Sequence, residues 1–251
     1  MAAIKEVAKV RHEKVIRAIA AHLRSNFADV AASTAIQLGE LDHPVSSELL
    51  VANIGPNDKR AVVLGAIFTS LGKLGYEAAS DRLVPLLDKQ NDDGWKKVLE
   101  ESVNAVGRIG NPRAVDPLLE WRKRQPGGGW GGRWGGGGGG GGGNQSGRLW
   151  GAVDRALKSI TGGDEETTND WEKWWKANRA DLMANATVTY RCKVTWERYD
   201  GPAGKRNPCP HAPDKGHTSC SQVIRTRMIP EPDAPAAPPG PPPGGGGGGN
   251  P

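Results

Sequence analysis

The stretch that decides the fold is VGRIGNPRAVDPLLEW, residues 106–121. It joins a glycine turn to a proline and then to a second apolar segment. Similar turns occur earlier, as LGEL at 38–41 and LGKLG at 71–75. The turns begin at Leu38, Leu71 and Val106, which are 33 and 35 residues apart. A period of this size is typical of helical repeats, in which each unit buries its apolar face only by stacking on its neighbours.

Each turn follows an amphipathic helix pattern. In residues 63–71 and 98–106 apolar side chains recur three and four positions apart, which predicts one buried helix face. A shorter helix is expected after each turn. Prolines at 44 and 112 suit a first helical turn, and glycines at 75 and 110 suit a helix C-terminus with positive φ.

This unit resembles the HEAT-like repeat of the phycobilisome-lyase group of α-solenoids. The resemblance is carried by the Leu/Val-Gly-x-Leu/Ile turn, the Asn-Pro-Arg-Ala-Val start at 111–115 and the Pro-Leu-Leu at 117–119, and it extends over about residues 12–162. It implies an all-α solenoid of about four helical hairpins. It implies little about function, because proteins with unrelated functions share these turn and packing positions.

A glycine-rich run, residues 126–148, interrupts the fourth repeat, and the helical pattern resumes in residues 147–162. We expect a disordered loop inserted between two helices rather than a domain boundary, because polyglycine has no side chains to pack. We interpret Asp154 and Lys158 as polar features of a terminal repeat. A Trp-rich helix, with Asn169 or Asp170 as N-cap and with Trp171, Trp174 and Trp175, is expected to cap the stack.

The C-terminal segment changes period. VTYRCKVTWERY, residues 188–199, alternates as a half-buried strand does, and SQVIRTRMI at 221–229 is a weaker second strand. The predicted domains are therefore a solenoid over 1–183, a small β-hairpin-like Cys/His segment over 184–230, and a disordered Pro/Gly-rich tail over 231–251.

Four potential metal ligands or thiols lie within that segment: Cys209, His211, His217 and Cys220. Their spacing differs from that of standard zinc fingers, so a Cys209–Cys220 disulfide is preferred over a zinc site, with unpaired thiols as the third alternative. A disulfide would indicate an oxidising compartment. Cys192 is expected to be a small buried residue.

Composition bounds the function without naming it. The net charge of +5 over 251 residues does not demand nucleic acid, and no stretch approaches the ~20 apolar residues of a membrane span. The first residues carry charges every few positions, which predicts a helix rather than a signal peptide. The sequence has no H-E-x-x-H, P-loop or G-x-S-x-G motif, so we expect no enzyme activity and no cofactor.

We therefore expect a non-catalytic scaffold or adaptor that binds another protein through the concave face of the solenoid. The residues of that face are predicted by their register to the glycine turns: Glu40, Thr69, Lys73, Asn104, Arg108 and Arg155. One alternative is an RNA-associated protein that uses the basic and aromatic residues in and around the glycine run: Arg122, Lys123, Arg124, Trp130, Arg133, Trp134 and Arg148. A bilin lyase-like enzyme is a third reading, raised by the resemblance alone.

Overall fold

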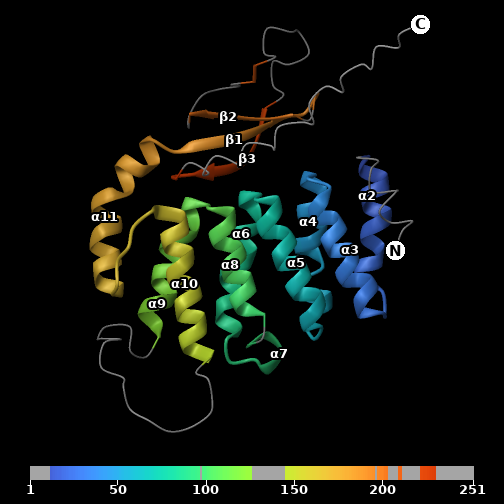
Figure 1. Ribbon diagram of the computed structural model, residues 1–251, viewed down its shortest axis with the longest axis horizontal. Coiled ribbons are helices and arrows are strands. Elements are labelled where there is room, and N and C mark those ends of the chain that lie inside the picture. Colours follow the sequence, from blue (N-terminus) through green and yellow to red (C-terminus); the bar gives the residue numbers. More distant parts are fainter. Residues whose placement is uncertain are drawn as a thin grey trace, which may run out of the picture.

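The computed structural model describes residues 12–96, 98–125, 145–195, 197–202, 209–210 and 221–229. Over these residues the chain is mostly helical, with one small antiparallel sheet (Figure 1). The α-helices are α2 (Glu13–Ala20), α3 (Ala28–Glu40), α4 (Pro44–Ala52), α5 (Ala61–Leu74), α6 (Glu77–Leu83), α7 (Asp93–Lys96), α8 (Leu99–Ile109), α9 (Val115–Arg124), α10 (Gln145–Thr161) and α11 (Thr168–Ala184). Short 3₁₀ turns join several of them: η1 (Ala21–Arg24), η2 (Gly55–Asn57), η3 (Val84–Lys89) and η4 (Pro112–Ala114).

The helices form two layers. In the first layer α3, α5, α8 and α10 pack side by side in that order. In the second layer α4, α6, α9 and α11 follow one another, with η3 between α6 and α9. Each glycine turn carries the chain from the first layer to the second, as the repeat pattern predicts. The buried apolar side chains of both layers form one continuous core.

The predicted turn chemistry is confirmed at both glycines and at Pro44. Gly75 ends α5 with φ of 66° and Gly110 ends α8 with φ of 71°, a left-handed conformation that suits glycine. Pro44 occupies the first turn of α4, where His43 caps the helix by accepting a hydrogen bond from Val45 N at 3.2 Å. The equivalent position after α3 is Asp42, which also has positive φ, at 48°.

The sheet differs from the expected two-stranded ribbon. It has three strands, β1 (Thr187–Cys192), β2 (Arg198–Pro202) and β3 (Ser221–Arg227), in the order β2-β1-β3, and both pairings are antiparallel. The alternating run at 188–199 is not one strand, because it turns at residues 193–195 and pairs with itself. Both faces of β1 are buried, including Arg191, whose side chain is 2% exposed. Alternation could not show this, since a buried arginine counts as polar in the pattern.

Helix α11 packs against α9 at one end of the helical array (Figure 1). Trp171 and Trp175 are buried there and Trp174 is half-buried. The N-cap is Thr167 rather than the predicted Asn169 or Asp170, and its hydroxyl accepts from the backbone N–H of Asp170 at 3.1 Å.

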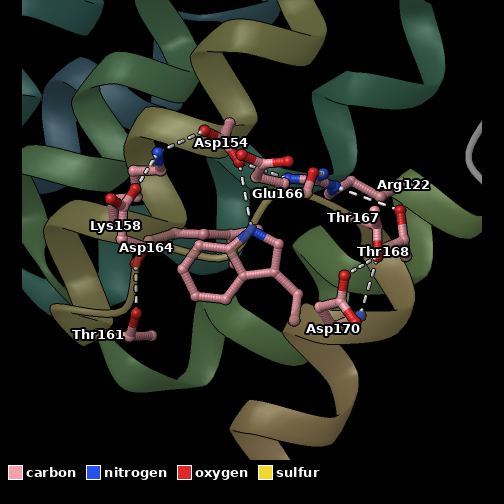
Figure 2. A network of polar contacts seen from close by, with 11 residues as sticks. Arg122, Asp154, Lys158, Thr161, Asp164, Glu166, Thr167, Thr168 and Asp170 are labelled. Carbon is pink, nitrogen blue, oxygen red and sulfur yellow. Dashed lines mark hydrogen bonds and ion pairs between the residues drawn. The ribbon is translucent and has the colours of Figure 1, made fainter. Parts of the chain in front are cut away.

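A polar network around the buried Arg122 joins α9, α10 and α11 (Figure 2). The sequence suggested that Asp154 belongs to a polar outer face of the last repeat, but the structure places it differently. It points toward Arg122 of α9, whose Nη1 donates to Asp154 Oδ1 at 2.7 Å, and it also accepts from Trp171 Nε1 at 3.2 Å. Lys158 pairs with both Asp154 and Asp164. In the earlier repeats the position of Asp154 holds an apolar side chain; in this repeat it holds a carboxylate paired with Arg122.

The glycine-rich run begins directly after α9 and ends in α10, and these two helices pack against each other. The run therefore joins neighbouring helices of the two layers. Its residues 126–144, and residues 231–251 of the predicted tail, lie outside the described part of the chain, so the expected disorder of both stays a prediction.

Candidate functional site

The six residues predicted to contact a partner all lie on the helices of the first layer. Five of them are exposed and Asn104 is half-buried. They are distributed over four successive helices: Glu40 on α3, Thr69 and Lys73 on α5, Asn104 and Arg108 on α8, and Arg155 on α10. We call this set the first-layer face. Equivalent positions that are 33 to 51 residues apart in the sequence are thus arranged along one row of adjacent helices.

Ion pairs link neighbouring helices across this face. Lys73 of α5 pairs with Glu40 of α3, and both side chains are about half exposed. Arg155 of α10 pairs with Glu100 of α8 at 2.9 Å, a partner that the register argument did not identify. Arg108 lies in the last turn of α8, with its side chain along Gly72 of α5. Among the residues described, no carboxylate forms an ion pair with Arg108.

The backbone under the face is closely packed. A Cβ on Gly39 would lie 2.8 Å from Ser70 Cβ, one on Gly72 would lie 3.1 Å from Ala105 Cα, and one on Gly107 would lie 3.0 Å from Ala156 Cα. The first glycine of each motif lies within its helix and therefore faces a small residue of the next helix. This repeated contact lets α3, α5, α8 and α10 approach more closely than helices with side chains at these positions could.

The second layer is more open. A groove of about 550 Å³ lies between α4 and α6. Most of its lining side chains are small or apolar, and two of them, Glu48 and Arg82, are charged. Its lining residues are Ser47, Glu48, Val51, Ala52, Ile54, Ala78, Ala79 and Arg82. In the first layer, by contrast, α3 and α5 are in close contact at Gly39 and Ser70.

Exposed apolar side chains accompany the first-layer face. Ile36 of α3 is 48% exposed and Val62 of α5 is 66% exposed. Phe27, the residue before α3, is 73% exposed. Exposed aliphatic and aromatic groups near charged residues are a common feature of protein-binding surfaces.

Of the predicted Cys/His site, only Cys209 lies within the described residues. It is buried and contacts Cys192, which is also buried, as predicted, and Tyr199 packs against both. His211, His217 and Cys220 lie outside that part of the chain, so both the zinc and the disulfide hypotheses stay predictions. In the described residues no cluster of three or more His, Cys, Asp or Glu side chains could hold a metal ion.

The basic and aromatic residues proposed for RNA binding fall into three groups. Arg122 is fully buried in the network of Figure 2, while Lys123 pairs with Glu120 and Glu172 and Arg124 pairs with Asp88. Arg148 is exposed on α10. The remaining three, Trp130, Arg133 and Trp134, lie outside the described residues. Three of the four described basic residues are therefore engaged within the protein.

None of the described helices has the length and apolar character needed to cross a membrane. No curated protein gives a significant match to the sequence. Residues 98–120 match the family model of the PBS lyase HEAT-like repeat. The matched segment runs from the start of α8 through the Gly110 turn to most of α9, and over this segment the chain is similar to a HEAT-like repeat.

Proposed function

We propose that the protein is a non-catalytic HEAT-like solenoid that binds another protein through the first-layer face. The observation that carries the proposal is the placement of the six residues on four successive, closely packed helices, flanked by exposed Ile36 and Val62. Repeat proteins of this kind use an extended surface built from equivalent positions of successive repeats.

The proposal assigns the concave side to the first layer. Close contacts at Gly39, Gly72 and Gly107 shorten the spacing of this layer, while the groove between α4 and α6 indicates a wider spacing in the second. A two-layer stack curves toward the layer with the shorter spacing. Under this proposal α11, with Trp171 and Trp175, caps the stack, because its buried indoles cover the end of the core that α9 and α10 would otherwise expose.

The RNA-associated alternative has less support, since Arg122, Lys123 and Arg124 form ion pairs with carboxylates of the protein itself. No observation in the described residues favours a bilin lyase-like activity.

The test is a comparison of capture by three forms of the full chain. Wild type, a Lys73→Ala/Asn104→Ala/Arg108→Ala variant, and a second-layer control would be used as bait in native lysate, with bound proteins quantified by mass spectrometry. The control, Asp81→Ala/Arg82→Ala/Arg113→Ala, removes three exposed side chains of α6 and η4. We expect at least one protein to be captured by wild type and control and lost with the first-layer variant. Equal capture by all three, with unchanged helical circular dichroism, would contradict the assignment.

A further inference from the structure

Four helices of the first layer end in a left-handed residue at the same end of the molecule. Asp42, Gly75, Gly110 and Gly162 have φ of 48°, 66°, 71° and 76°. They follow α3, α5, α8 and α10, respectively. In Figure 1 the sheet lies across these helix ends, with β3 nearest to them. The repeat thus presents four similar termini, in order, to one sheet.

Strand β3 and the residues after it contact three of these termini in succession. A Cβ on Gly75 would lie 3.1 Å from Arg225 Nη1, and one on Gly110 would lie 3.2 Å from Arg227 Nε. A Cβ on Gly162 would lie 3.2 Å from Ile229 Cδ1. Alternate residues of an extended segment share one face, so one strand can meet three helices.

The fourth terminus is held by β1 and β2. Arg191 of β1 donates through Nη2 to the backbone oxygen of Asp42 at 2.8 Å and pairs with its carboxylate at 3.0 Å. Arg198 of β2 pairs with the same carboxylate and donates to Leu74 O, at the end of α5, at 3.3 Å. One aspartate, in a position that is glycine in the next two repeats, therefore binds arginines of both strands, and Arg198 also contacts the end of α5.

The chemistry of these contacts suits helix C-termini. Their last carbonyl groups have no partner within the helix and carry partial negative charge, so arginine side chains stabilise them. The contact is also apolar, because Ile224 and Met228 belong to the same core as the helices. The sheet is therefore attached along the row of helices rather than at a single point.

We propose that the sheet is a strap that fixes the spacing of α3, α5, α8 and α10 and thereby positions the first-layer face. Only the second part of this inference, the positioning of the first-layer face, rests on the proposed function. Arg191 and Arg198 are positioning residues: they hold Asp42 and the end of α5, and they do not belong to the face. Because Glu40 and Lys73 lie in the last turns of α3 and α5, a loosened strap would displace them directly.

The experiment compares the full-length wild type with an Arg191→Ala/Arg198→Ala variant and with Arg113→Ala, which removes an exposed arginine of η4 as the matched control. Hydrogen exchange would be followed by mass spectrometry in the last turns of α3 and α5. Loss of several charge-assisted hydrogen bonds should speed exchange there about tenfold or more. The first turns of the same helices should exchange as in wild type. Capture of the partner should fall about fivefold or more, although every residue of the face is intact.

Each outcome decides one half of the proposal. Unchanged exchange in the last turns would overturn the strap itself. Faster exchange with undiminished capture would overturn the positioning role. If wild type captures no protein, the proposed function fails, while the exchange result still decides whether the sheet holds the helix ends. Asp42→Asn, which keeps the shape of the side chain, replaces the double variant if the latter loses its helical circular dichroism.

Discussion

Arginine side chains attach both helix α11 and the three-stranded sheet to the helical repeats, but the contacts of α11 and those of the sheet differ in their arrangement. At α11 the fully buried Arg122 binds a side chain of α10, the backbone just before α11 and Thr168, the first residue of α11. Its guanidinium carbon also lies 4.4 Å from the centre of the Trp150 ring. At the sheet, Arg191, Arg198, Arg225 and Arg227 are distributed over the ends of three helices.

The two arrangements differ because the sheet contacts several repeats, whereas α11 contacts the last one. The sheet lies where equivalent helix ends recur, so its contacts are divided among several arginines. Helix α11 lies where the repeat stops, and its junction depends mainly on one buried arginine, with further contacts of Trp175 and Arg179 to Asp116 of α9. A single substitution should therefore be far more costly at α11 than at the sheet.

The largest effect is expected for Arg122→Ala. It leaves Asp154 as a carboxylate without its main counter-charge, and breaking a buried pair in this way typically costs about 3–5 kcal/mol. Urea unfolding of the variant should show a loss of this size. A matched double variant, Arg122→Met/Asp154→Leu, removes both charges and should recover much of the stability, because the desolvation cost disappears with them. A loss below about 1 kcal/mol for Arg122→Ala would place the pair among surface ion pairs and contradict the comparison.

A smaller effect is expected within the first layer. Gly107→Ala puts a Cβ 3.0 Å from the backbone of Ala156, so α8 and α10 must separate. Overpacking of this kind costs about 1–3 kcal/mol. Gly65→Ala on α5 is the control, since nothing lies within 4 Å of its Cβ, and it should stabilise the helix by about 0.5–1 kcal/mol. A lower melting temperature for Gly107→Ala and a higher one for Gly65→Ala would support close helix packing as the role of the motif glycine. A higher melting temperature for Gly107→Ala would exclude it.

At high pH the sheet junction should weaken. Burial raises the pKa of Tyr76 from its usual value near 10.0 to about 12, although nearby Arg191 opposes the shift. The folded state thus resists ionisation of Tyr76, and the corresponding stability is present below pH 10 and lost as the pH rises from 10 to 12. Tyr76→Phe should show a shallower loss of stability than wild type over this interval in denaturant titrations. Identical slopes would mean that Tyr76 stays un-ionised or does not matter for folding.

The smallest change in stability is expected for Arg155→Ala. Its pair with Glu100 is exposed, so its loss should cost less than about 1 kcal/mol. The same variant should nevertheless weaken partner capture if Arg155 belongs to the binding face. A destabilisation as large as that of Arg122→Ala would show that the pair is structural.

The sequence alone predicted the repeat, its glycine turns and the exposure of the first-layer face, because these depend on local periodicity and on residues with unusual backbone freedom. It did not predict Asp154 pointing inward, since the partner, Arg122, lies across the glycine-rich run. It also missed the turn at 193–195, because alternation continues through the hairpin. Asp42 offered a signal that could have been used: it is the one charged residue at a position that is glycine in the next two repeats.

Site-specific photo-crosslinking tests the central claim most directly. A photoreactive amino acid would replace Thr69, at the centre of the first-layer face, or Asp81, exposed on α6 in the second layer. The account predicts that the captured protein forms a covalent adduct from position 69 and none from position 81. An adduct from position 81 alone would place the partner on the second layer and contradict the proposed function.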